Sequence, residues 1–215
     1  MKKPNILILS VIIFSLFSCK GEGLHKEFSY GEFSNQKYIN EFFQIKLDIP
    51  NTWTVASKDD RDELFENLEI DQTLNKKERE LFKKNKHRNA YIFLAHKYNP
   101  NTFQGPVNPT FHIAVERVDD NKFVRNAEDY MKLARKTSRM TSDIKQEITK
   151  TARVKLGGNE FERHVIKQKF DVIEYEITQF CEILNGYAVV YSLIYSSEED
   201  RRQLVKCLSS LKHIL

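Results

Sequence analysis

The six histidines are the first candidates for chemistry in this sequence, because imidazole binds transition metals and titrates near neutral pH. His96 and His112 lie in two neighbouring β-rich runs. An antiparallel ladder in which Tyr98 pairs with Thr110 would make these histidines face each other. Glu116 would then lie two positions farther along the same face, completing a possible metal-binding group. A one-residue change of register separates the pair, so hydrogen-bonded or solvated strand histidines remain the favoured interpretation.

Cys19 is the second candidate, because it follows an apolar run near the start of the chain. Lys2 and Lys3 precede this run, which extends from Ile6 to Phe17. It is too short to span a bilayer, which takes about 20 residues, and has the length of a signal-peptide core. The sequence Leu16-Phe17-Ser18-Cys19 resembles the lipobox of bacterial lipoproteins. The resemblance implies cleavage before Cys19 and its attachment to membrane lipid by acylation; a secretory signal with an incidental cysteine is the alternative.

The lipobox resemblance divides the chain into three parts. Residues 1–18 are expected to be a removed signal peptide, and residues 19–36 a lipidated N-terminus and flexible tether with glycine, serine and charges but no periodicity. Residues 37–215 are long enough for a single domain. Lys20, directly after the cysteine, resembles the sorting pattern for the outer membrane. We therefore expect a protein of the bacterial cell envelope, on the periplasmic side of the outer membrane rather than at the plasma membrane.

A basic run between Asn75 and Arg88 is a candidate contact surface. Its cationic side chains would bind anionic headgroups or an acidic partner near the membrane. The favoured alternative is a solvated helix face, set against the acidic segment 59–71. The candidate contact residues are Lys76, Lys77, Lys83, Lys84, Lys86 and Arg88.

Composition and motifs exclude several classes of function. Without Lys2 and Lys3, 32 basic residues face 30 acidic ones, a balance that argues against nucleic-acid binding, as does export. The sequence lacks GxSxG, P-loop, GxGxxG, CxxC and HExxH motifs, so we expect no enzyme activity and no cofactor. Acidic pairs such as Asp119-Asp120 fall at the ends of predicted elements, where capping and solubility explain them.

Two further sets of residues have both a functional and a structural interpretation. Cys181 and Cys207 are expected to be separately buried thiols, with a disulfide left open because the sequence does not give their separation. Tyr187, Tyr191 and Tyr195 share one face of a predicted strand and could line a cleft. Packing beneath a helix is the favoured interpretation of this tyrosine row.

The elements that must position these residues follow from periodicity and turn signals. A period-two strand covers 43–49, and further strands are expected over 90–98, 110–119, 145–156, 159–170, 173–184 and 187–196. Gly157-Gly158 and Asn185-Gly186 predict hairpin turns. Helices are expected to begin at four capping residues, and the last should reach about Lys212. These capping residues are Ser57, Asn75, Asn126 and Ser197.

This order predicts an α+β fold, an α/β/α sandwich whose central, mostly antiparallel sheet has about six or seven strands and flanking helices. The opening FQIKLDIPNTW (43–53) and closing NGYAVVY (185–191) resemble the PsbP-like superfamily. The resemblance covers about residues 37–215 and implies a non-enzymatic module that binds other proteins. We therefore expect a lipid-anchored accessory protein with an unidentified protein partner in the envelope. A small-molecule or metal carrier is the alternative, and a hydrolase comes third.

Overall fold

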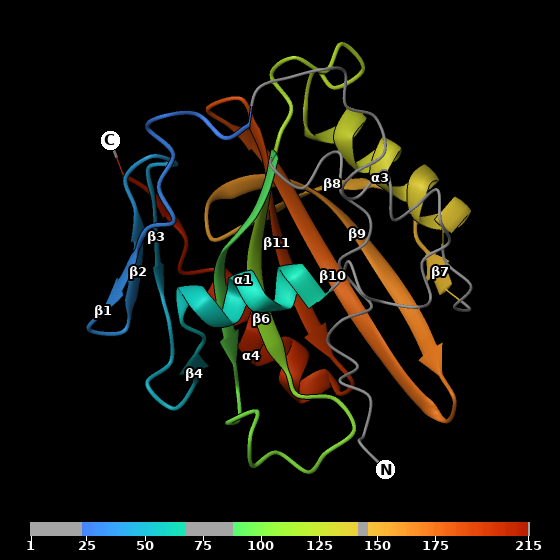
Figure 1. The fold of residues 1–215 in the computed structure, drawn as a ribbon. Coiled ribbons are helices and arrows are strands. Elements are labelled where there is room, and N and C mark those ends of the chain that lie inside the picture. The colour runs from blue at the N-terminus through green and yellow to red at the C-terminus, as the bar shows by residue number, and fades with distance from the viewer. Residues whose placement is uncertain (1–22, 68–87, 142–145, 215) are drawn as a thin grey trace.

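The computed structural model describes residues 23–67, 88–141 and 146–214, which form two antiparallel sheets and three helices (Figure 1). The smaller sheet has the order β1-β2-β3-β12. The larger sheet has eight strands in the order β4-β5-β6-β11-β10-β9-β7, with β8 also paired to β9. The α+β class predicted from the sequence, with a central, mostly antiparallel sheet and flanking helices, is confirmed. The central sheet has eight strands instead of the expected six or seven, and the strand predicted at 43–49 belongs to the smaller sheet.

The elements have the following bounds. The smaller sheet consists of β1 (Glu32–Ser34), β2 (Lys37–Asn40), β3 (Ile45–Asp48) and β12 (Lys212–His213). The larger sheet consists of β4 (Thr54–Val55), β5 (Asn89–His96), β6 (Thr110–Arg117), β7 (Gln146–Ile148), β8 (Ala152–Leu156), β9 (Asn159–Phe170), β10 (Ile173–Leu184) and β11 (Tyr187–Tyr195). The helices are α1 (Lys58–Asn67), α3 (Ala127–Thr141) and α4 (Glu198–Leu208).

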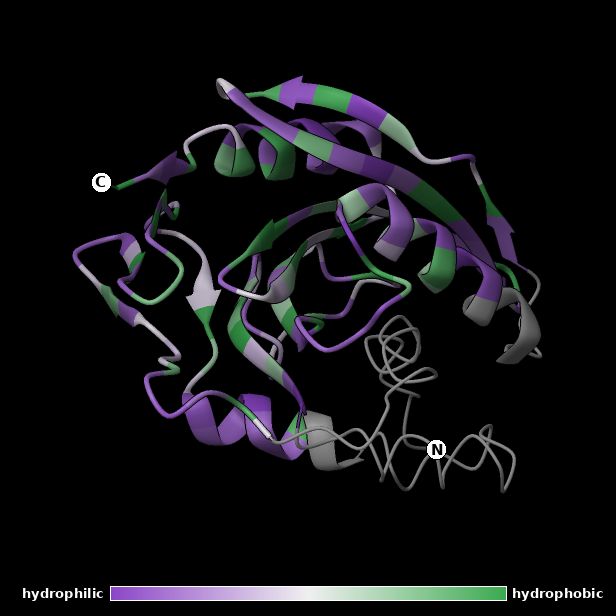
Figure 2. Ribbon diagram, turned by 90° about the horizontal axis from the view of Figure 1, so that it is seen from above, coloured by the Kyte–Doolittle hydropathy of each residue, from purple (hydrophilic) through white to green (hydrophobic). Residues whose placement is uncertain are grey.

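Two hydrophobic cores lie on opposite faces of the larger sheet, because successive side chains of a strand point to opposite faces. In β11, Tyr187, Tyr191 and Tyr195 pack into the core beneath α4 and the smaller sheet, while Val190 and Ile194 pack into the core beneath α3. Figure 2, seen from above, shows the matching alternation of hydrophobic and hydrophilic residues along the long strands. The predicted packing of the tyrosine row beneath a helix is confirmed.

The helix starts were predictable because their capping contacts are local. Asn126 Oδ1 accepts a hydrogen bond from the backbone N–H of Asp129 at 2.9 Å, and Ser197 Oγ accepts one from that of Asp200 at 3.1 Å. Ser57 caps α1 in the same way. The start predicted at Asn75 lies outside the described residues.

The predicted end of the last helix near Lys212 is wrong. Helix α4 ends at Leu208, and Ser209 closes it through a hydrogen bond from its N–H to the Val205 carbonyl at 2.8 Å. The chain then turns and pairs Lys212 with Lys46 of β3. The helix therefore ends where the chain pairs with a strand more than 160 residues earlier, and the residues around Leu208 do not predict this end.

Both hairpin turns predicted from glycine are confirmed. Asn185 and Gly186 join β10 to β11 with backbone φ values of 48° and 81°, as a type I′ turn requires. Gly157 and Gly158 likewise join β8 to β9, with φ values of 60° and 95°.

Replacing Gly157 with alanine should destabilise the protein more than the same change at Gly158. A Cβ at Gly157 would lie 2.3 Å from the Ser209 carbonyl oxygen, whereas one at Gly158 would have no neighbour within 4 Å. Both substitutions carry the strain of a positive φ, so we expect a loss of about 2 kcal/mol for Gly157→Ala and about 1 kcal/mol for Gly158→Ala. Urea unfolding of the two variants measures the difference, and equal losses would contradict the close approach to Ser209.

Candidate functional site

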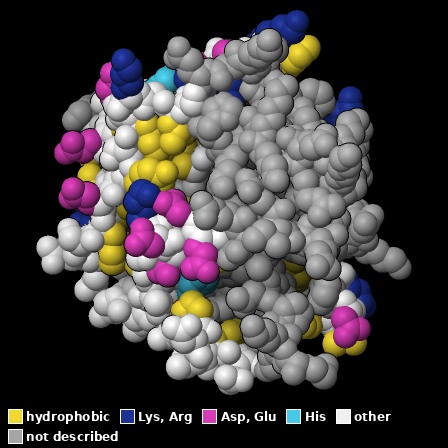
Figure 3. All heavy atoms as spheres, viewed as in Figure 1, with side chains coloured by type: hydrophobic (Ala, Val, Ile, Leu, Met, Phe, Trp, Pro, Cys, Tyr) yellow, Lys and Arg dark blue, Asp and Glu magenta, His cyan; other side chains and the backbone are white. Residues whose placement is uncertain are grey.

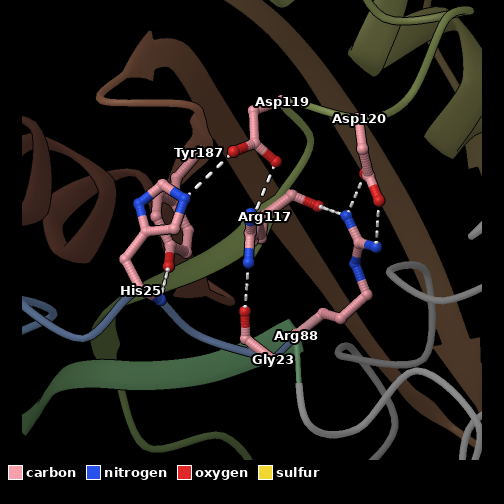
Figure 4. A network of polar contacts seen from close by, with 7 residues as sticks. All are labelled: Gly23, His25, Arg88, Arg117, Asp119, Asp120 and Tyr187. Atoms are coloured by element: carbon pink, nitrogen blue, oxygen red, sulfur yellow. Dashed lines mark hydrogen bonds and ion pairs between the residues drawn. The ribbon is translucent and has the colours of Figure 1, made fainter. Parts of the chain in front are cut away.

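The N-terminal segment is fastened to one end of the larger sheet by a network of polar contacts (Figure 4). Arg117 donates a hydrogen bond to the Gly23 carbonyl at 2.7 Å. The backbone N–H of His25 donates to the Tyr187 hydroxyl at 2.8 Å, and its ring Nε2 lies 3.0 Å from a carboxylate oxygen of Asp119. Three separate contacts therefore hold the chain where it enters the domain.

The end of β6 and the start of β11 position this network. Arg117 and Tyr187 are cross-strand partners, and the Asn185-Gly186 turn lies directly beside them. The backbone N–H groups of Val118 and Asp119 both donate to the Gly186 carbonyl, at 2.8 and 3.1 Å. The hairpin turn that the sequence predicts therefore also fixes the loop after β6.

Two adjacent carboxylates are bound by two different arginines. Arg117 Nε donates to Asp119 at 2.9 Å, while the Arg88 guanidinium binds both carboxylate oxygens of Asp120 and donates to the Arg117 carbonyl at 2.8 Å. The hydrogen bond from Arg88 lowers the pKa of Asp120. Burial raises the pKa of Asp119, but the hydrogen bonds from Arg117 and His25 outweigh it, so this pKa is also lowered. The sequence analysis assigned this acidic pair to capping and solubility, whereas in the structure both carboxylates bind arginines.

Arg88 is not a surface-contact residue as predicted. Its side chain is only 2% exposed, and its charge is directed into the network. The other candidates of the basic run, the lysines at 76, 77, 83, 84 and 86, lie outside the described residues.

The predicted flexible tether is also shorter than expected. Residues 32–34 form β1, which pairs with β2, and Phe28 packs edge-on against Tyr30 and Phe43 at the margin of the core. The aromatic side chains in this segment indicate that it packs against the domain, because solvated linkers contain few aromatic residues. The chain is thus part of the domain from Gly23 onward.

The histidine pair is on one face, but in a different register from the predicted one. His96 pairs with Thr110 and His112 pairs with Leu94, a shift of two residues that leaves the histidines as diagonal neighbours. The side chain of Asn108 causes the shift, because it binds the backbone N–H and carbonyl of Tyr98 at 3.2 and 2.9 Å in place of a strand partner.

The predicted third member of this group is engaged elsewhere. Glu116 accepts a hydrogen bond from the Tyr130 hydroxyl at 3.0 Å, and burial raises its pKa to about 8. Within residues 23–67, 88–141 and 146–214, no three His, Cys, Asp or Glu side chains come together as metal ligands. His96 and His112, the pair that the sequence analysis considered as metal ligands, therefore have no third ligand beside them in the part of the chain that is described.

Three histidines are buried in the larger sheet, and two of them, His112 and His164, end a row of polar pairing partners that crosses β6, β11, β10 and β9 through Ser192 and Gln179. His96 Nδ1 lies 2.9 Å from Thr110 Oγ1, and His164 Nε2 lies 2.8 Å from Gln179 Oε1. Burial lowers the pKa of His96 and His164 to about 4 and that of His112 to about 3. His164 was not singled out from the sequence, although it alternates with the buried Ile166.

The two cysteines are free and lie on opposite sides of the larger sheet. Cys181 belongs to the core beneath α3 and Cys207 to the core beneath α4, so the sheet separates them and no disulfide joins them. Burial raises the pKa of both thiols, which disfavours the nucleophilic thiolate.

An open groove lies at the end of the larger sheet farthest from Gly23. It has a volume of about 690 Å³ and runs between the projecting β9–β10 hairpin and the start of α4. Charges of both signs line it in pairs: Lys169 lies 2.8 Å from Glu174, and Lys167 lies 3.9 Å from Glu176. Strand β11 runs from the network at Tyr187 to the groove, a span of about 27 Å at the usual strand rise.

No protein-family model matches this sequence, and no curated protein sequence is significantly similar to it. Several solved structures match this chain, among them the following two. The cyanobacterial PsbP protein (CyanoP) of Synechocystis sp. PCC 6803 is 11% identical, with a TM-score of 0.49 over 92% of this chain and 98% of that one. A protein from Bacteroides thetaiotaomicron is 11% identical, with a TM-score of 0.47 over 84% of this chain.

The chain spans 48% of the length of the Bacteroides thetaiotaomicron protein. At this identity the likenesses describe an arrangement of strands and helices and transfer no site. No helix in the described part of the chain is long and apolar enough to cross a membrane.

Proposed function

We propose that the protein is a lipid-anchored, non-enzymatic module of the bacterial cell envelope that binds another protein. The fixed position of Gly23 carries the proposal. Cys19, the proposed acylated residue, lies four residues before Gly23, so the connection spans at most about 14 Å. An anchor this close holds the network end of the domain at the membrane and directs the groove at its other end away from it.

The groove suits a polar partner. Its two lysines are each paired with a glutamate, and such an arrangement recognises an extended segment by exchanging charge partners. Two tyrosines that line the groove, Tyr175 and Tyr195, have pKa values that burial raises to about 12, so neither hydroxyl is the kind of base that catalysis uses near neutral pH. We place the module on the periplasmic side of the outer membrane, following Lys20 after the cysteine.

Substitution of Cys19 tests the anchor. Cys19→Ala should abolish incorporation of radiolabelled palmitate and move the protein from the membrane to the soluble fraction, because the acyl chains supply the binding energy. Cys207→Ala is the matched control: its thiol is buried in the core, so labelling and fractionation should not change. If Cys19→Ala remains labelled and membrane-bound, the proposal is wrong.

A photo-crosslinking amino acid tests the groove. Placed at Glu174, which is 72% exposed in the groove, it should capture a protein in intact cells. The same amino acid at Asp59 in the acidic surface over α1, visible in Figure 3, is the control and should capture none. Equal capture at both positions, or none at Glu174, would remove the groove from the proposal.

A further inference from the structure

A loop at the network end of the domain carries an exposed aromatic side chain. The loop joins β6 to α3, and Phe123 at its tip is 61% exposed. Lys122 places its ammonium group 5.3 Å from the centre of the Phe123 ring, and the Arg125 side chain is 81% exposed. Figure 3 shows this combination of basic and hydrophobic side chains at the top of the molecule.

The loop is built to hold its tip in one position. The side-chain oxygen of Asn121 accepts a hydrogen bond from the backbone N–H of Phe123 at 3.1 Å. Its backbone carbonyl accepts one from the N–H of Val124 at 2.9 Å. The Asn121 N–H itself donates to the Val118 carbonyl at 2.9 Å. Arg88 and Arg117 fix the preceding carboxylates, as described above. An exposed apolar side chain on a rigid turn loses little conformational entropy when it is buried by a partner.

The loop lies beside the point where the chain would reach the membrane. Asp119, four residues before Phe123, contacts His25, and Gly23 is bound by Arg117 in the same network. The other exposed large apolar residues of the described chain lie on other elements. Val172 is at the tip of the β9–β10 hairpin and Tyr98 follows β5, both at the groove end of the larger sheet, whereas Phe33 and Ile39 belong to β1 and β2 of the smaller sheet (Figure 1).

We propose that Phe123, Lys122 and Arg125 form a second contact with the membrane to which Cys19 is anchored. The phenyl ring enters the interface between headgroups and acyl chains, while the two cations bind anionic phospholipid headgroups. One acylated residue alone leaves the domain free to tilt, and a second contact fixes its orientation. This inference rests on the proposed lipid anchor.

Fluorescence quenching by brominated lipids tests this contact. The acylated protein, which begins at Cys19, is reconstituted into phosphatidylethanolamine vesicles that contain phosphatidylglycerol, either as Phe123→Trp or as Tyr98→Trp at the groove end. Phe123→Trp should be strongly quenched and Tyr98→Trp should not, relative to the unsubstituted chain, in which Trp53 is buried. The proposed contact is wrong if both variants are quenched equally. It is also wrong if Phe123→Trp is not quenched although the protein is bound to the vesicles.

Charge reversal provides the second measurement. Lys122→Glu in the Phe123→Trp background should shift the equilibrium between domains whose loop touches the membrane and domains whose loop does not about 25-fold toward the second state. Each unit of charge near an anionic surface contributes about fivefold, and the reversal changes the charge by two units. Lys169→Glu, at the groove end, should not change the quenching, and an unchanged signal in Lys122→Glu counts against the cationic contact. Flotation of the unsubstituted protein with vesicles distinguishes the loop contact from the anchor at Cys19. If the protein floats but Phe123→Trp is not quenched, only the loop contact is wrong. If the protein does not float, the anchor is wrong as well.

Discussion

Acidification from neutral pH to about pH 5 should lower the free energy of unfolding by about 3 kcal/mol. Three histidines buried in the larger sheet have pKa values lowered to about 4, 3 and 4, namely His96, His112 and His164. Burial is the main cause, since it disfavours the charged imidazolium. Nε2 of His112 is buried without a hydrogen-bond partner, so a proton there would gain no compensating contact.

The sign follows from comparing protons in the two states. In unfolded chains histidine has a pKa of about 6.5, so the stability these groups provide is complete above that pH. As the pH falls toward 4, the histidines bind protons in the unfolded chain but stay neutral in the folded protein, so the free energy of unfolding decreases. Glu116 acts in the opposite direction, because its folded pKa of about 8 keeps it protonated where the unfolded chain has released the proton.

Urea unfolding between about pH 5 and 7.5 measures this balance. His164→Gln should flatten the pH dependence, because glutamine removes one proton-binding group while retaining a partner for Gln179. Glu116→Gln should steepen it to about 6 kcal/mol over the same range, since the opposing group is gone. A pH dependence that these two substitutions leave unchanged would mean that other groups control acid unfolding.

The parts of the fold that could be predicted from the sequence are those fixed by neighbouring residues. The Asn185-Gly186 turn needs only two residues able to adopt positive φ between strands, and the Ser197 cap needs only an acceptor before a helix. The alternation in 43–49 likewise records which face of a strand is buried: Phe43, Ile45, Leu47 and Ile49 are all at most 2% exposed.

The parts that could not be predicted depend on contacts across the chain. Burial of Arg88 requires the carboxylate of Asp120, 32 residues away, and no pattern around Arg88 distinguishes it from the preceding lysines. The register of His96 depends on Asn108, whose side chain takes the place of a strand residue. In the candidate site, Arg117 lies beside Tyr187 because β6 pairs with β11, and Asp119 contacts His25 only because the N-terminal segment folds back onto this end of the sheet.

Asp120→Ala should destabilise the protein by about 3 kcal/mol, far more than loss of an ordinary surface carboxylate. Its partner Arg88 is 2% exposed, so the guanidinium would remain buried with only the Arg117 carbonyl among its former partners. Asp120 is itself 33% exposed, which moderates the loss below that of a fully buried pair.

Glu174→Ala is the matched control for this substitution. It removes a carboxylate from Lys169 at a similar distance, but both side chains are more than half exposed, so the free energy of unfolding should hardly change. The double variant Arg88→Met with Asp120→Ala should recover about half of the loss, since removing both charges leaves none buried without a partner.

Asp120→Ala should also weaken the proposed contact between the loop and the membrane. Asp120 holds the first part of the loop that carries Phe123, so its loss should release the loop while the anchor at Cys19 is retained. In the Phe123→Trp chain on vesicles, Asp120→Ala should therefore reduce quenching by brominated lipid without reducing flotation, and Glu174→Ala should change neither. Full quenching in Asp120→Ala would show that the loop reaches the membrane without the Arg88 ion pair, which would then be a purely structural contact.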